Sequence, residues 1–264
     1  MPKNKSNFIY PLPWLGGKRR IVHRFLHLLT QHMRPGVSYT EPFAGGAAVA
    51  LTLLDRLPWA DVWLNDVYRP VYAFWKTIRD DHEFLIDKLY GEHCERDKWE
   101  EYHQSIANGT VADLKELGWR LCALHAWSYG QKGVSFNPRC GSRAKLHTKE
   151  QQYRNAHRLL RDAKITNLDF RQVLKDDDSV LYCDPPYVGA ARRKYYAHGF
   201  TQLDHLMLRD IVLARQSPWL MSYDDHPAIW NRYKTCRIQT IVFGRGLGGP
   251  TRFYKEVLIT PHIQ

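Results

Sequence analysis

Short apolar runs alternate with helically spaced apolar positions in the first part of the chain. Residues 38–40 and 62–64 are short runs with β-branched and aromatic residues, and they predict two strands. Apolar residues recur every three or four positions in three other segments, which predicts helices over 18–33, 47–54 and 70–80. Strands that alternate with helices predict a parallel sheet covered by helices, so we expect an α/β fold.

The pattern changes between residues 81 and 164. This block contains helical stretches such as 111–128, followed by a turn-rich segment over 129–147 that could form a β-hairpin or a loop, and it shows no alternation of strands with helices. Connections between neighbouring strands of such a sheet are usually much shorter. We therefore expect 81–164 to be an inserted, mainly helical module, and 1–80 together with 165–264 to form the main domain.

The strand pattern returns at Ile165 and continues to the end of the chain. Thr201 and Asp204 form a capping-box-like start for a helix over 203–214. The last two strands flank the glycine-rich segment 244–250 and predict a terminal antiparallel hairpin. The predicted strands of this half are 180–183, 219–223, 238–243 and 255–260.

The sequence Asp184-Pro185-Pro186-Tyr187 ends the apolar run 180–183 and is the most informative feature of the chain. A buried strand that stops at an acid places this carboxylate at the carboxyl edge of the sheet, where open α/β folds bind ligands. The proline-stiffened carbonyls accept hydrogen bonds, and the tyrosine offers a flat face. This combination suits a planar heterocycle with an exocyclic amine, such as a flipped nucleobase, although four such residues could also be an ordinary polar turn.

A second candidate site lies earlier in the chain. Asp66 follows Gly45 by 21 residues, close to the roughly 20-residue gap between a nucleotide-binding glycine turn and the acid that binds ribose hydroxyls. The full glycine motif of dinucleotide-binding folds is absent. Spacing alone therefore leaves open both a nucleoside site and an ordinary strand–helix–strand unit.

Charge and cysteine content bear on partners and location. The formal net charge is +11, which favours a polyanionic partner such as nucleic acid. Basic residues gather in 130–164, although Arg154, Arg158 and Arg161 at helical spacing could form a solvated face. The five cysteines form no regular framework, so we expect reduced thiols, no zinc and no other metal. No apolar segment reaches the length of a membrane span, so we expect a soluble, cytoplasmic protein.

Four segments, in this order, resemble the motifs of the Dam-like family of DNA N6-adenine methyltransferases. They are Trp14-Leu15-Gly16-Gly17-Lys18, Glu41-Pro42-Phe43-Ala44-Gly45-Gly46, Leu64-Asn65-Asp66 and Asp184-Pro185-Pro186-Tyr187. The insert also occupies the place of the family's target-recognition module. Within it, 129–133 and 136–137 resemble the recognition hairpin, although the surrounding residues depart from better-known members.

The resemblance implies a Rossmann-like methyltransferase sheet with a terminal antiparallel hairpin and an inserted DNA-recognition module. It implies transfer of a methyl group from S-adenosylmethionine to N6 of a flipped adenine in double-stranded DNA, in a bacterial or phage-infected cell, by a monomer or weak dimer. The implied catalytic residues are Asp184, Pro185, Pro186 and Tyr187. The expected cofactor-binding residues are Trp14, Gly17, Lys18, Pro42, Phe43, Gly45, Asp66, Asp169, Phe170 and Asp184. The expected DNA-binding residues are Tyr129, Lys132, Asn137, Arg139, Arg143, Lys145, Arg192, Arg193 and Arg252.

Two other interpretations are open at this point. A similar tetrad can hold another amine acceptor, such as an RNA adenine or N4 of cytosine. A non-catalytic DNA-binding relative of the same fold is a further alternative, which the intact tetrad disfavours. Hydrolytic enzymes are disfavoured because the HExxH and GxSxG motifs are absent.

Overall fold

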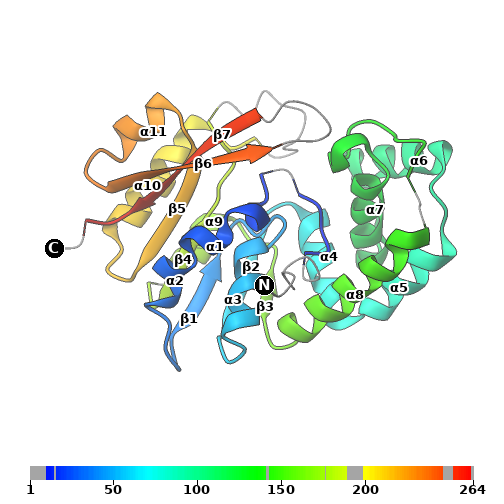
Figure 1. Ribbon diagram of the computed structural model, residues 1–264, viewed down its shortest axis with the longest axis horizontal. Coiled ribbons are helices and arrows are strands. Elements are labelled where there is room, and N and C mark those ends of the chain that lie inside the picture. The colour runs from blue at the N-terminus through cyan, green and yellow to red at the C-terminus, as the bar shows by residue number, and fades with distance from the viewer. Residues whose placement is uncertain are drawn as a thin grey trace.

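The computed structural model describes residues 10–14, 16–140, 143–175, 177–188, 199–245 and 252–262, without the side chains of 143–145, 245 and 252. Within these residues, seven strands form one sheet in the order β3-β2-β1-β4-β5-β7-β6 (Figure 1). The strands are β1 (Ser38–Glu41), β2 (Val62–Asn65), β3 (Lys164–Thr166), β4 (Ser179–Cys183), β5 (Trp219–Asp224), β6 (Arg237–Arg245) and β7 (Arg252–Thr260).

The sheet combines a parallel body with an antiparallel edge. Strands β3, β2, β1, β4 and β5 pair in parallel, whereas β7 pairs antiparallel to both β5 and β6. The expected Rossmann-like methyltransferase sheet with a terminal hairpin is therefore confirmed. The chain order changes direction between β1 and β4, and such a switch point opens a crevice at the carboxyl ends of the strands.

Helices account for most of the remaining described residues. They are η2 (Lys18–Arg20), α1 (Val22–Phe25), α2 (His27–Thr30), α3 (Ala48–Arg56), α4 (Arg69–Asp80), α5 (His82–Gly91), α6 (Arg96–Ala107), α7 (Leu114–Ala126), η3 (Tyr129–Gln131), α8 (Arg143–Leu160), α9 (Phe170–Val173), α10 (Gln202–Ala214) and α11 (Pro227–Arg232). The prediction of a single helix over 18–33 is wrong in detail, because this segment forms three short helices, η2, α1 and α2. Ile21, with φ at −121°, leaves helical geometry at the first division.

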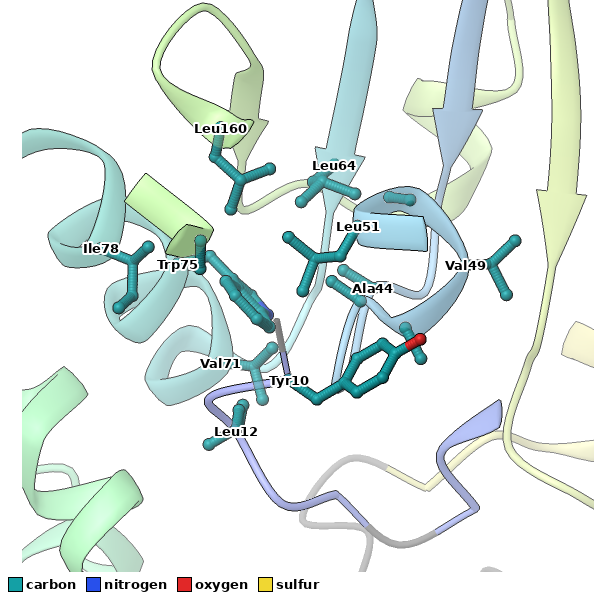
Figure 2. Close-up of a cluster of buried hydrophobic side chains, with 14 of the residues drawn as sticks. Tyr10, Leu12, Ala44, Val49, Leu51, Leu64, Val71, Trp75, Ile78 and Leu160 are labelled. Carbon is teal, nitrogen blue, oxygen red and sulfur yellow. The ribbon is translucent and has the colours of Figure 1, made fainter. Parts of the chain in front are cut away.

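Alternating residues of the central strands supply two cores, one on each face of the sheet. Val180 and Tyr182 of β4 join the larger core with α1, α3, α4 and α8. Leu181 and Cys183 point to the other face and pack with α10 and α11. Figure 2 shows part of the larger core, where Trp75 of α4 faces Leu51 of α3 and lies near Leu160 of α8. Helices thus cover both faces, as a parallel sheet requires.

The segment between β2 and β3 is helical, as predicted. Helices α5 to α8 gather at one end of the molecule beside α4, on the right of Figure 1. Gly118 brings α7 so close to α4 that an added Cβ would lie 2.8 Å from backbone atoms of Phe74. The insert is therefore packed directly on the main body, while its treatment as a separate domain stays a prediction.

The expectation of five reduced cysteines is wrong for two of them. Cys94 and Cys140 form a disulfide, with Cα atoms 6.2 Å apart, and Cys122, Cys183 and Cys236 are free and buried. Sequence spacing could not reveal this pair, because 46 residues separate the partners and only the fold of the insert brings them together. No described helix combines the length and apolar character needed to cross a membrane.

Candidate active site

The crevice at the switch point is a cavity of about 240 Å³. Parallel pairing of β1 with β4 places Glu41, the last residue of β1, and Asp184, which directly follows β4, on the same edge of the sheet. The cavity brings together every residue predicted for the cofactor and the tetrad. They are Trp14, Gly17, Lys18, Pro42, Phe43, Gly45, Asp66, Asp169, Phe170, Asp184, Pro185, Pro186 and Tyr187.

The glycine turn and the acid at the end of β2 are joined directly. The backbone N–H of Gly45 donates to Oδ2 of Asp66 over 2.8 Å, and the N–H of Tyr68 donates to Oδ1 over 2.9 Å. Burial outweighs these two hydrogen bonds and raises the pKa of Asp66 to about 6. Each carboxylate oxygen still has a lone pair for a further donor, such as a hydroxyl group in the cavity.

Aromatic side chains form the apolar part of the cavity wall. The rings of Phe43, Phe170 and Phe200 lie between 5.4 and 5.6 Å from one another, measured between centroids. Asp169 caps α9 and thereby fixes the start of the turn that carries Phe170. An apolar wall of this kind, with a carboxylate nearby, suits a purine nucleoside.

Trp14 connects the cavity to the insert. An added Cβ at Gly45 would lie 2.6 Å from the indole, so only glycine permits this approach, and its φ of +45° also favours glycine. The other face of Trp14 stacks on His125 of α7, with centroids 5.2 Å apart. His125 in turn contacts the carbonyl of Gln131 in the turn-rich segment. Trp14 is therefore part of the cavity wall rather than ordinary core.

Asp184 is held from two sides. Lys18 is buried, and its Nζ lies 2.5 Å from Oδ2 of Asp184. On the other side, the hydroxyl of Ser222 in β5 donates to Oδ1 of Asp184 over 3.0 Å. Burial alone would lower the pKa of Lys18, but the charges of Asp184 and Glu256 outweigh it and raise this pKa. The carboxylate is thereby fixed in orientation beside a permanent cation.

Tyr187 belongs to the same network. Its hydroxyl accepts from Nζ of Lys18 over 2.9 Å and donates to Oε1 of Glu256 over 3.1 Å. Glu256 comes from β7 and is buried, and burial raises its pKa. The terminal hairpin therefore provides Glu256 as a hydrogen-bond partner for the tetrad, and the sequence pattern did not indicate this contact.

Glu41 is a second carboxylate that was not assigned to the site. The hydroxyl of Tyr39 donates to its Oε1 over 2.6 Å, and burial raises the pKa of Glu41 to about 8. The signal that could have found Glu41 was its position at the end of a strand, whereas Ser222 lies within β5 and gave no such signal. Within the described part of the chain, no cluster of three or more His, Cys, Asp or Glu side chains could hold a metal ion.

A second cavity, of about 400 Å³, adjoins the first through Trp14, Gly17 and Tyr187. Its walls come mainly from three parts of the fold, namely the amino-terminal motif, the turn-rich segment of the insert and the terminal hairpin. The charged and aromatic lining residues are Tyr10, Trp14, Arg19, Arg20, Tyr187, Asp224, Phe243, Tyr254, Lys255 and Glu256. Arg19, Arg20 and Lys255 are exposed, so this cavity has a positively charged rim.

Four of the predicted DNA-binding residues of the insert, Tyr129, Lys132, Asn137 and Arg139, lie in or just after one exposed loop, whereas Arg143 and Lys145 belong to α8. An isolated bridge between Ser128 and Phe136 closes the loop, and the N–H of Tyr129 donates to the carbonyl of Ser135 over 3.0 Å. Tyr129, Lys132 and Arg139 are exposed and Asn137 is half-buried. Lys132 and Arg139 take part in none of the ion pairs found among the described residues. The side chains of Arg143, Lys145 and Arg252, and the whole of Arg192 and Arg193, lie outside the described part.

Four members of the basic cluster in the insert are engaged within the protein, namely Lys149, Arg154, Arg158 and Arg161. Arg154 pairs with Glu83 and with Glu150, as expected for a solvated face with partners. Nζ of Lys149 donates to the carbonyl of Pro11 over 2.5 Å, and burial lowers the pKa of Lys149. The net charge of 130–164 therefore overstates the charge available to a polyanion.

Comparison with known proteins gives a consistent result. The sequence model of a family described as D12 class N6 adenine-specific DNA methyltransferase matches residues 14–242. The chain is 28% identical to the type II methyltransferase M.MjaIII of Methanocaldococcus jannaschii, over 67% of this chain and 68% of that protein. It is 25% identical to the type II methyltransferase M1.LlaDCHI of Lactococcus lactis subsp. cremoris, over 91% of this chain and 90% of that protein. It is 26% identical to a DNA adenine methylase of Vibrio cholerae, over 76% and 74%.

Proposed function

Because the chain belongs to the D12 class of N6 adenine-specific DNA methyltransferases, we propose that its two adjoining cavities bind the methyl donor and the target adenine. The smaller cavity would hold S-adenosylmethionine, and the larger one would admit a base flipped out of double-stranded DNA. The observation that carries this proposal is the position of Tyr187, which lines both cavities, next to Asp184, which lines the smaller one and shares Lys18 with it.

The residues of the smaller cavity fit the donor group by group. The carboxylate of Asp66 suits the ribose hydroxyls, because it is fixed by two backbone N–H groups and retains acceptor capacity. Phe43 and Phe170 suit the adenine ring. Asp184 and Tyr187 suit a cationic centre, since they offer negative charge and an aromatic face. When bound, S-adenosylmethionine supplies a methyl group on a sulfonium that is already a good leaving group.

The tetrad supplies orientation rather than covalent chemistry. The amino nitrogen of adenine is conjugated into its ring, so the protein must turn the nitrogen lone pair towards the methyl group. Asp184 would accept a hydrogen bond from this amine, with its other contacts to Lys18 and Ser222 keeping the carboxylate in place. Tyr187 would stack on the base and offset part of the unstacking cost, which is on the order of a few kcal/mol.

The exposed loop at Tyr129, Lys132 and Arg139 and the basic rim of the larger cavity would contact the DNA. Cations at these positions neutralise phosphates, which positions the duplex without reading its sequence. The contacts from Gln131 to His125 and from His125 to Trp14 place this loop in direct connection with the cofactor cavity. Target recognition and donor binding are therefore expected to be linked in this protein.

The direct test uses purified protein, labelled S-adenosylmethionine and unmethylated plasmid DNA. We expect label in N6-methyladenine after nucleoside digestion, at one short sequence motif revealed by methylation-sensitive sequencing. Label in N4-methylcytosine, or transfer to RNA but not to duplex DNA, would contradict the proposal. Absence of both transfer and donor binding would point to a non-catalytic relative.

A further inference from the structure

We infer that Glu256 is a positioning residue for methyl transfer, which acts through Tyr187 and Lys18 on the carboxylate of Asp184. This inference rests on the proposed function of the site. Glu256 lies in the last strand, beyond residue 242 where the match to the family's sequence model ends. Its role is therefore drawn from the geometry of this chain.

The contacts of Glu256 form a continuous path to the tetrad. Oε1 accepts from the hydroxyl of Tyr187 over 3.1 Å, and that hydroxyl accepts from Nζ of Lys18 over 2.9 Å. Nζ also contacts Oδ2 of Asp184 over 2.5 Å. Glu256 thus determines the direction in which the hydroxyl of Tyr187 donates its proton. The oxygen of this hydroxyl is then free to accept a hydrogen bond from Lys18. The alternating donors and acceptors fix both ends of the tetrad before a substrate enters.

The charge pattern supports a positioning role. Lys18 is a buried cation with two carboxylates beside it, Asp184 at 2.5 Å and Glu256 at 3.6 Å. Because Glu256 also attracts the ammonium group of Lys18, the positive charge of Lys18 is divided between two carboxylates and is not bound by Asp184 alone. Asp184 then retains acceptor capacity for an amine.

The alternative is that Glu256 only holds the hairpin to the sheet. Burial of a carboxylate is costly, and β7 already pairs with β5 and β6 along its length. Oε1 of Glu256 accepts from Tyr187, and Oε2 lies 3.6 Å from Nζ of Lys18. Both oxygens therefore face Lys18 and the tetrad rather than another part of the hairpin.

The test compares Glu256→Gln with Glu256→Asp and with the exposed control Glu100→Gln on α6. For Glu256→Gln we expect kcat to fall about tenfold or more, as is typical when a residue that orients a ligand-contacting group is lost. The Kd for S-adenosylmethionine should change less than about twofold, because Glu256 does not line the smaller cavity. Because Glu256 does line the larger cavity, a raised KM for duplex DNA with an unchanged kcat would indicate direct contact with the base and would overturn the positioning role. Glu256→Asp keeps the charge and should retain more activity than Glu256→Gln, and Glu100→Gln should match the parent.

A double-mutant cycle with Tyr187→Phe separates positioning from a general loss of stability. If Glu256 acts through the tyrosine hydroxyl, Glu256→Gln should cost much less in the Tyr187→Phe background than in the parent. A parent-like kcat for Glu256→Gln, or losses that multiply fully in the double variant, would overturn the inference. A parent protein that transfers no methyl group to DNA would overturn the proposed function itself, which distinguishes the two failures.

Discussion

The ammonium nitrogen of Lys18 lies 2.5 Å from Oδ2 of Asp184, although 166 positions separate the two residues in the chain. The amino-terminal motif and the tetrad therefore form one unit rather than two neighbouring sites. Sequence analysis assigned Lys18 to the binding of the methyl donor, and that role stays a prediction. The structure gives Lys18 a second task, which is to hold the carboxylate that would face the target amine.

Replacement of Lys18 by Met should impair both stability and activity. The change leaves Asp184 and Glu256 side by side without a cation, and loss of one partner from a buried pair costs about 3 kcal/mol or more. Thermal unfolding and steady-state methyl transfer measure the two effects. Lys76→Met is the matched control, because its pair with Asp80 is exposed and should contribute less than about 1 kcal/mol. Equal melting temperatures for the two variants would refute the buried pairing.

Donor binding should depend on pH through Asp66. The pKa of this carboxyl group is raised to about 6, so the ionised form that accepts from ribose hydroxyls is lost as the pH falls through this value. We expect the affinity for S-adenosylmethionine to be about tenfold weaker at pH 5 than at pH 8. Calorimetric titration of the parent and of Asp66→Asn measures this. The variant should bind weakly at every pH, and an unchanged pH dependence in Asp66→Asn would exclude Asp66 as its origin.

Contacts with DNA phosphate should be confined to basic residues that lack partners within the protein. Lys132→Ala should weaken duplex binding for all sequences and reduce the slope of log affinity against log salt concentration by about one. Arg154→Ala is the control, because its guanidinium is already paired with Glu83 and Glu150. Fluorescence anisotropy over a salt series gives both slopes. A larger effect for Arg154→Ala would place the DNA on another face of the insert.

Gly118 should be essential for the docking of the insert. An added Cβ would meet backbone atoms of Phe74 at 2.8 Å, which cannot move as a flexible side chain can. Gly118→Ala should therefore lower the free energy of unfolding by about 1–3 kcal/mol. Chemical denaturation measures this, and Gly91→Ala, where an added Cβ meets nothing within 4 Å, is the control. If both variants unfold at the same denaturant concentration, α7 is not packed as described.

Much of the fold could be predicted because its signals are local. Strand–helix alternation, the capping box at Thr201 and the two terminal strands each depend on neighbouring residues, and the structure confirms them. Gly45 and Asp66, which the 21-residue spacing had assigned to one site, form a direct hydrogen bond. These patterns are visible in sequence because the relevant physics acts over a few residues or one supersecondary unit.

The rest of the site could not be predicted because it depends on long-range pairing. Glu256 reaches Tyr187 only because β7 pairs antiparallel with β5, and its register is set by the whole hairpin. His125 reaches Trp14 only because α7 packs on α4. The disulfide of Cys94 with Cys140 follows from the internal fold of the insert, and the burial of Lys149 follows from how the insert packs on the amino-terminal segment at Pro11.

The most direct test of the site replaces Asp184 with Ala and measures methyl transfer to duplex DNA in a single turnover, alongside donor binding by calorimetry. The proposed arrangement predicts that transfer falls below detection while S-adenosylmethionine still binds, because the residues around Asp66 and Phe170 are intact. Transfer at the parent rate by Asp184→Ala would contradict it.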